Sequence, residues 1–180
     1  MYALRLGRRD KDELSLIEAD LAEADLGRLT RWRRWIEKCD SLRLLHREAE
    51  AALAAQEAKK WMETLNAEPA FDVSERDGRL AVTLARLGQT DESIAAGRRY
   101  VAAASPTNQV RSRWDREIAL AGLYAYLNRP RECVELIAKL LRVPSGLTVP
   151  MLKGDPTWDS MREDAGFKAL LADPKNSAPL

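Results

Sequence analysis

Two parts of this 180-residue chain repeat the same order of features. Each has a residue that suits a tight turn, a small residue five positions later, and a proline beyond the next helical pattern. The two sets are Gly88, Ser93 and Pro106, and Asn128, Cys133 and Pro144, with 40 positions between the turn residues and between the small residues. Gly and Asn end helices readily, and proline cannot continue one. The repeat therefore predicts helical hairpins that stack into an α-solenoid, because one hairpin cannot bury its apolar face alone.

The composition agrees with an all-helical chain. Aromatic residues make up only 6% of the sequence, and no segment bounded by turn residues alternates apolar and polar positions. Helix-forming Ala, Leu, Arg and Glu dominate instead. We expect an all-α solenoid in three parts: an N-terminal helical extension over residues 1–50, repeated hairpins over 51–144, and C-terminal capping helices over 145–180.

The pattern from Thr30 to Asn66 stays helical without Gly or Pro. This pattern is longer than most helices of globular proteins, so we expect a turn inside it. The candidate positions are Asp40–Ser41 and the region around Gln56. The end of the pattern fits the second helix of a degenerate earlier repeat, and His46 then takes the small-residue position of that repeat.

The charge balance gives no reason to expect nucleic acid or an anionic membrane as a general partner, because 29 basic and 28 acidic residues leave a net charge of +1. Cys39 and Cys133 form no CxxC pair, and the single His46 leaves no zinc ligand set, so we expect buried thiols, no metal and no cofactor. No phosphate-binding glycine loop is present, and we expect no enzyme. No stretch approaches the roughly 20 apolar residues of a membrane span, which favours a cytoplasmic protein.

Four carboxylates crowd into the segment MLKGDPTWDSMRED, namely Asp155, Asp159, Glu163 and Asp164. One interpretation is a metal or acid–base site. A calcium loop, however, needs oxygen ligands at alternating positions around a Gly, and these residues do not alternate. The other interpretation is helix capping, because Asp155 precedes Pro156 and proline suits the first helical turn. We favour capping, with Asp164 as the cap of the next helix.

The same tail carries apolar residues that suit the end of a repeat array. Phe167, Leu170 and Leu171 are spaced as on one face of a helix, and Trp158 precedes them. An open end of a solenoid would expose the apolar face of its last hairpin. We therefore expect these side chains to be buried and to close the array.

One cluster of basic and aromatic residues covers residues 28–36, where Arg28, Arg31, Arg33 and Arg34 surround Trp32 and Trp35. Such a cluster could contact the phosphates of nucleic acid, so a regulator associated with nucleic acid is the alternative function. The two tryptophans share one helical face with Ile36 and Cys39, which favours a packed core with arginines outside it. We therefore do not expect nucleic acid as the partner.

The stretch LARLGQTDESIAAGRRYVAAASP resembles a tetratricopeptide repeat (TPR). Gly88 stands at the turn, Ser93 at the small position where two helices touch, and Pro106 after the second helix. The second copy keeps the small residue and the proline but has Asn128 at the turn. Its period also exceeds the roughly 34 residues of the family. The resemblance implies TPR-like hairpins that bind a protein or peptide.

The tail LLRVPSGLTVPMLKGDPTWDSMREDAGFKALL looks like the segment that closes the repeat arrays of bacterial signalling proteins. In those proteins the array follows a Ser/Thr protein kinase, a nucleotide cyclase or a winged-helix regulator domain. The matching positions are Asp155, Pro156, Trp158, Asp159, Arg162, Asp164, Phe167, Leu170 and Leu171. The resemblance implies a scaffold or regulatory module of a signalling protein, and it allows for an effector domain encoded upstream.

When such hairpins stack, the first helix of each one lines a concave groove. This arrangement puts seven residues near the predicted groove: Arg79, Val82, Arg86, Asp115, Ile118, Gly122 and Tyr126. Their mixed character suits an extended peptide or a partner helix, with Arg86 and Tyr126 as the expected anchors. The alternative is a groove that is unused or filled by residues 1–50. We expect non-catalytic protein binding.

Overall fold

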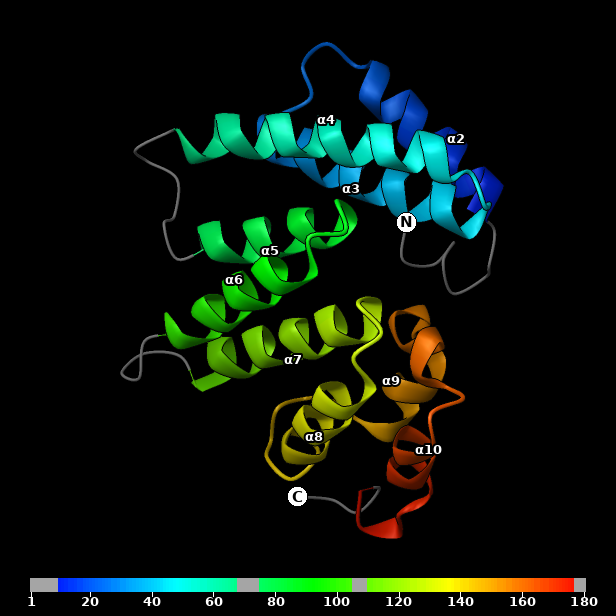
Figure 1. Cartoon of the computed structure of the whole chain (residues 1–180), viewed down its shortest axis with the longest axis vertical. Coiled ribbons are helices and arrows are strands. Elements are labelled where there is room, and N and C mark those ends of the chain that lie inside the picture. The colour runs from blue at the N-terminus through cyan, green and yellow to red at the C-terminus, as the bar shows by residue number, and fades with distance from the viewer. Residues whose placement is uncertain (1–9, 68–74, 105–109, 177–180) are drawn as a thin grey trace. The chain divides into compact units, whose positions relative to one another are not determined.

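The computed structural model of the chain describes residues 10–67, 75–104 and 110–176 (Figure 1). The regular structure of these residues is entirely helical, which confirms the expected all-α class. The chain divides into two compact units, Met1–Ser93 and Ile94–Leu180, and the division falls inside helix α6 (Thr90–Ala102). This division coincides with neither of the expected boundaries, after residue 50 and after residue 144.

The first unit contains α2 (Asp10–Ala22), α3 (Arg28–Leu44), α4 (Glu48–Asn66) and α5 (Arg76–Arg86). Helices α3 and α4 pack side by side (Figure 1). The buried face of α4 is rich in alanine, and small side chains at a contact reduce the distance between two helix axes. These alanines are Ala51, Ala54, Ala55 and Ala58. Leu14 of α2 packs on the same core, against Cys39 and Leu42 of α3.

The turn between α3 and α4 lies at Leu45–Arg47, and neither Asp40–Ser41 nor Gln56 interrupts a helix. The predicted turn position is therefore wrong. Its central residue is His46, which is a less usual helix-ending residue than Gly or Asn. Residues 28–66 form one hairpin as a result, and the expected boundary between residues 50 and 51 falls inside α4.

The same backbone turn follows α3, α5 and α7 (Val110–Tyr126), and leads in the last case into α8 (Pro130–Leu140). Its central residue has a positive φ in all three copies: His46 at 58°, Gly88 at 76° and Asn128 at 52°. The amide of the next residue donates to the carbonyl five positions before it, with N···O distances of 2.8 Å (Arg47 to Leu42), 2.9 Å (Gln89 to Leu84) and 2.9 Å (Arg129 to Tyr124). This is the Schellman arrangement. The repeat expected at Gly88 and Asn128 thus has a third copy at His46.

A small residue follows each turn five positions later, and each is 0% exposed: Ala51, Ser93 and Cys133. The Oγ–H of Ser93 donates to the Ala81 carbonyl at 2.7 Å, and the Sγ–H of Cys133 donates to the Ala121 carbonyl at 3.5 Å. Both bonds join the second helix of a hairpin to the first, and they satisfy polar groups that burial would otherwise leave without water. In the α3–α4 hairpin this position belongs to Ala51, so the small-residue position expected for His46 is wrong.

Two substitutions test the turn geometry. Gly88→Ala is expected to lower the free energy of unfolding by about 1 kcal/mol, because a β-carbon disfavours a positive φ. His46→Gly is expected to raise it by a few tenths to about 1 kcal/mol, because the same strain is removed and His46 is exposed. Urea unfolding followed by circular dichroism measures both, and a neutral Gly88→Ala would contradict the left-handed turn.

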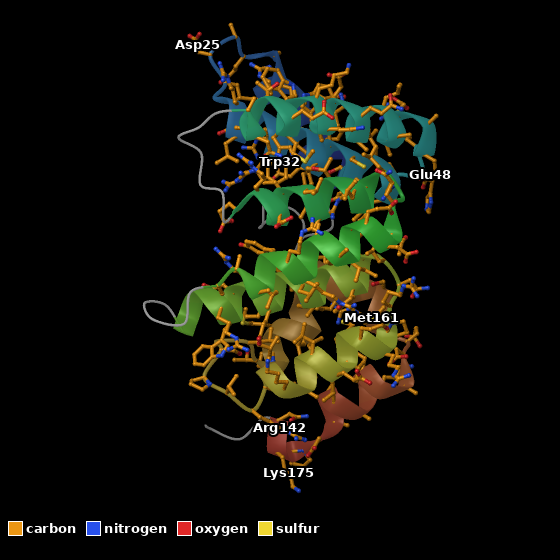
Figure 2. All side chains as sticks on the ribbon, turned by 60° about the vertical axis from the view of Figure 1, so that its left-hand side comes forward. Asp25, Trp32, Glu48, Arg142, Met161 and Lys175 are labelled. Carbon is orange, nitrogen blue, oxygen red and sulfur yellow. The ribbon has the colours of Figure 1, made fainter. Side chains whose placement is uncertain are left out.

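In the second unit the chain beyond α8 folds back on α7 and α8. The tail consists of α9 (Val149–Gly154), η2 (Pro156–Met161), α10 (Ala165–Ala172) and η3 (Pro174–Asn176). Helix η2 packs on α7, and α10 packs on α8 and α9. Trp158 and Phe167 are 3% and 0% exposed, which confirms their expected burial, whereas Leu170 and Leu171 are only half-buried. Met161, labelled in Figure 2, is 1% exposed.

Three aspartates start η2, α10 and η3 of this tail. Their Oδ1 atoms accept backbone amides at 2.8 Å (Asp155 from Thr157), 2.8 Å (Asp164 from Phe167) and 2.9 Å (Asp173 from Lys175). A side-chain cap of this kind satisfies an amide at the helix start that has no partner within the helix. The capping interpretation of Asp155 and Asp164 is therefore confirmed, and Asp173 adds a third cap.

Candidate partner-binding surface

The seven residues expected near the predicted groove are divided between the two units. Helix α5 of the first unit carries Arg79, Val82 and Arg86, and helix α7 of the second unit carries the other four, Asp115, Ile118, Gly122 and Tyr126. The three α5 residues pack within the first unit, whereas the four α7 residues differ among themselves in exposure.

Arg86 forms a two-point ion pair with Asp40 of α3. Its Nε donates to Oδ1 at 3.1 Å and its terminal nitrogen to Oδ2 at 2.9 Å. The side chains of Arg86 and Asp40 are only 13% and 14% exposed. Arg43 of α3 also donates to the Arg86 carbonyl at 2.8 Å. A parallel pair of bonds between guanidinium and carboxylate is both strong and directional, so it fixes α5 against α3.

Val82 and Arg79 also pack inside the first unit. Val82 contacts the apolar cluster that includes Trp32 and Ile36 of α3, and Arg79 is 6% exposed. Next to them, the Nε1–H of Trp32, which Figure 2 labels, donates to Thr83 Oγ1 at 3.1 Å. This side of α5 is therefore covered by α3 and α4 together. Helix α3 belongs to residues 1–50, whereas most of α4 lies beyond them, so the cover of α5 comes from both sides of that expected boundary.

The four residues of α7 fall into two pairs. Asp115 is exposed and Ile118 is half-buried. Gly122 lies against η2, because a β-carbon added there would meet Cγ2 of Thr157 at 3.3 Å. Tyr126 is half-buried, and η2 contacts the same end of α7 through Ser160, whose Oγ–H donates to the Ala125 carbonyl at 2.8 Å. The tail thus occupies the C-terminal part of α7, whereas Asp115 and Ile118 lie before that part, toward the N-terminus of the helix.

The tryptophans of the cluster at residues 28–36 belong to the core. Trp32 is 8% exposed, Ile36 7% and Cys39 0%, and Trp35 packs partly buried against the same clusters. This confirms the expected apolar face. Trp32 therefore presents little surface to a nucleic-acid base or a membrane, whereas Trp35 is half-buried.

The partners of Arg31 and Arg34 of this cluster lie within the chain. Arg31 donates to the Leu21 and Glu23 carbonyls at 3.2 and 2.8 Å, and its guanidinium lies 5.2 Å from the centre of the Trp61 ring. Arg34 pairs with Asp20 at 2.7 Å and with Glu37 at 2.6 Å. Both side chains thus hold the end of α2 onto α3. Arg33 is exposed.

Both cysteines are buried thiols, as expected. Desolvation by burial raises the pKa of Cys39 to about 11, and the nearby Asp40 carboxylate adds to the effect. Burial likewise raises the pKa of Cys133 to about 12. A thiol with a raised pKa stays protonated at neutral pH, and the thiolate is the reactive form. Neither residue therefore has the character of a nucleophile.

The carboxylates of the tail have structural partners. Asp159 pairs with Arg162 at 2.6 Å and Glu163 with Lys168 at 2.7 Å, in addition to the three aspartate caps. In the described ranges, no group of three or more His, Cys, Asp or Glu side chains is arranged to hold a metal ion. None of the helices in the described part of the chain combines the length and apolar character that crossing a membrane requires.

The chain matches no known family model, no curated protein and no solved structure. The fold and surface therefore define only a broad class of protein. It is an all-helical protein whose hairpins share one turn geometry and whose last hairpin carries a packed tail.

Proposed function

We propose that this chain is a non-catalytic scaffold or regulatory module that binds a protein or peptide. The observation that carries the proposal is the recurrence of one turn at His46, Gly88 and Asn128, each followed by a fully buried small residue. In repeated hairpins the buried positions maintain packing, and the outward positions are left to vary with the partner. A fold alone does not determine a function, and the side chains exposed on the hairpins determine which partner can bind.

The finer assignment is a TPR-like solenoid in the cytoplasm, as part of a bacterial signalling protein. Its support is the resemblance of the tail, in which the matched residues have identifiable roles. Asp155 and Asp164 cap helices, and Trp158 and Phe167 are buried. A tail that closes a repeat array needs capped helices and buried apolar side chains. The residues of this tail that match the resemblance supply both.

The partner surface that we propose is the face of α7 around Asp115 and Ile118. Asp115 is exposed and Ile118 half-buried, so a carboxylate and an apolar side chain lie one helical turn apart. Such a pair suits a peptide that presents a basic and an apolar side chain at neighbouring positions. The α5 residues of the predicted groove are less suitable, because Arg86 would first have to leave Asp40.

Selection of peptides from a displayed library on the immobilised chain tests this proposal. We expect enriched peptides with basic and apolar residues, and we expect Asp115→Lys or Ile118→Glu to weaken their binding by about tenfold or more. Leu16→Glu, at an exposed position of α2, is the matched control and should leave binding unchanged. Failure to enrich any peptide would overturn the function, whereas binding that both α7 variants retain would overturn only the surface. Duplex DNA serves as the comparison ligand, and salt-dependent binding of it would favour the nucleic-acid alternative.

A further inference from the structure

Helix α7 carries a tryptophan beside the proposed partner surface. This residue, Trp114, is half-buried, so part of its surface is exposed. Of the other tryptophans, Trp32 and Trp158 are buried, and Trp35 and Trp61 each have a cation over the indole ring. No described residue places a cation over the ring of Trp114. Because tryptophan is enriched among the side chains that contribute most to protein interfaces, Trp114 is suited to contact a partner.

Trp114 and Asp115 stand on either side of Ile118 on the surface of α7. They precede Ile118 by four and three residues, the two spacings at which side chains are neighbours on a helix. At about 3.6 residues per turn, Ile118 lies between them around the helix. Asp115 is exposed, and no described cation pairs with its carboxylate. A partner side chain that crosses Ile118 can therefore reach both an indole ring and a free carboxylate.

The basic residue directly before Trp114 does not occupy this position. Arg113 donates through Nε to Glu117 at 3.2 Å, and Lys139 of α8 donates to the same carboxylate oxygen at 2.9 Å. Glu117 is only 3% exposed and faces the core, whereas Asp115 faces solvent. Arg113 is thus directed away from Asp115. The carboxylate of Asp115 is available to a cation of another molecule.

We propose that the partner peptide presents an arginine to this surface, with its guanidinium between the indole ring of Trp114 and the carboxylate of Asp115. This inference rests on the proposed function, since it names the basic residue of the same peptide. The aliphatic stem of an arginine can pack on Ile118 while its planar face contacts the ring and two parallel hydrogen bonds join it to the carboxylate. A lysine ammonium is a compact, strongly hydrated charge that offers no plane to the ring. The surface therefore selects arginine over lysine.

The chain already contains both parts of this contact. The guanidinium of Arg31 lies 5.2 Å from the centre of the Trp61 ring and donates at the same time to the Glu23 carbonyl at 2.8 Å. Contact with a ring thus leaves the N–H groups at the edge of a guanidinium able to donate. The two-point pair of Arg86 with Asp40 is the second part. One guanidinium can therefore contact an indole face and a carboxylate together.

Two displayed peptide libraries test the selection of arginine. One has a fixed central arginine and contains no lysine, and the other has a fixed central lysine and contains no arginine. The immobilised chain is expected to enrich the arginine library about tenfold or more over the lysine library. Equal enrichment of both libraries overturns the arginine inference and leaves the proposed function standing, whereas enrichment of neither library overturns the proposed function itself.

Substitution of Trp114 tests whether the ring causes the preference. Fluorescence anisotropy with an enriched arginine peptide and its lysine analogue gives the ratio of their two dissociation constants. Trp114→Leu should reduce the preference for arginine about threefold to tenfold, because the lost ring contact favours the guanidinium. Trp61→Leu, at a half-buried tryptophan of α4, is the matched control and should leave the ratio unchanged.

Trp114→Tyr keeps an aromatic ring and should retain part of the preference, so it serves if Trp114→Leu does not fold. Far-ultraviolet circular dichroism checks the fold of each variant. A folded Trp114→Leu with the wild-type ratio overturns the inference, and so does a loss of preference that Trp61→Leu reproduces.

Discussion

Phe167→Ala is expected to lower the free energy of unfolding by about 3 to 5 kcal/mol. Phe167 is 0% exposed at the start of α10, directly after the cap made by Asp164. Helix α10 lies close to α8 there, since a β-carbon added at Gly166 would meet Cγ1 of Val134 at 3.4 Å. Removing the ring leaves a cavity that this packing cannot easily collapse to fill. Denaturant unfolding followed by circular dichroism gives the difference.

The control for this result is Met151→Ala in the same tail. Met151 is 47% exposed, so its loss should change the free energy of unfolding by less than about 0.5 kcal/mol. Trp158→Ala should behave like Phe167→Ala, because Trp158 is 3% exposed beside α7. If Phe167→Ala were as mild as Met151→Ala, the tail would not be part of the core of the second unit.

Asp40→Ala is expected to lower the free energy of unfolding by about 2 to 3 kcal/mol, because it leaves the guanidinium of Arg86 largely buried without its two-point partner. Arg86→Met keeps the apolar stem of the arginine and removes only its charge, so it should cost less. The double variant Asp40→Ala/Arg86→Met should cost less than the sum of the two single changes. The shortfall measures the coupling between the two side chains.

The Arg131–Glu135 pair of α8 provides the comparison for this cycle. Its side chains are 86% and 66% exposed, and its coupling should stay below about 0.5 kcal/mol. A coupling between Asp40 and Arg86 that is no larger than this would mean that the pair does not hold α5 against α3 in solution. Arg86 would then be available to a partner, as the sequence alone suggests.

The features that sequence predicted correctly are those encoded over a few residues. Asp155 and Asp164 could be predicted as caps because each accepts a hydrogen bond from the amide two or three residues later in the chain. Gly88 and Asn128 mark their turns because both residue types tolerate a positive φ. The turn at His46 was missed because histidine adopts that conformation less often, although more often than most side chains. Ala51 was missed because one alanine among many carries no signal.

The packing of the α5 residues of the predicted groove could not be predicted from local sequence. The partner of Arg86 is Asp40, 46 positions earlier in the chain. Nothing local to either residue indicates that pairing, since it depends on how α3 and α5 pack. The same holds for Gly122, whose neighbour Thr157 belongs to the returning tail. A surface position inferred from one repeat cannot anticipate which other segment of the chain will cover it.

The recurring turn also determines which substitutions such a chain can tolerate. Its bonds run between backbone atoms, and the side chain at its centre can be imidazole, hydrogen or carboxamide without altering them. The segments 42–51, 84–93 and 124–133 are equal in length and begin and end at corresponding points. Segments of different sequence can therefore form the same turn, provided that the central residue tolerates a positive φ and the fifth residue after it is small.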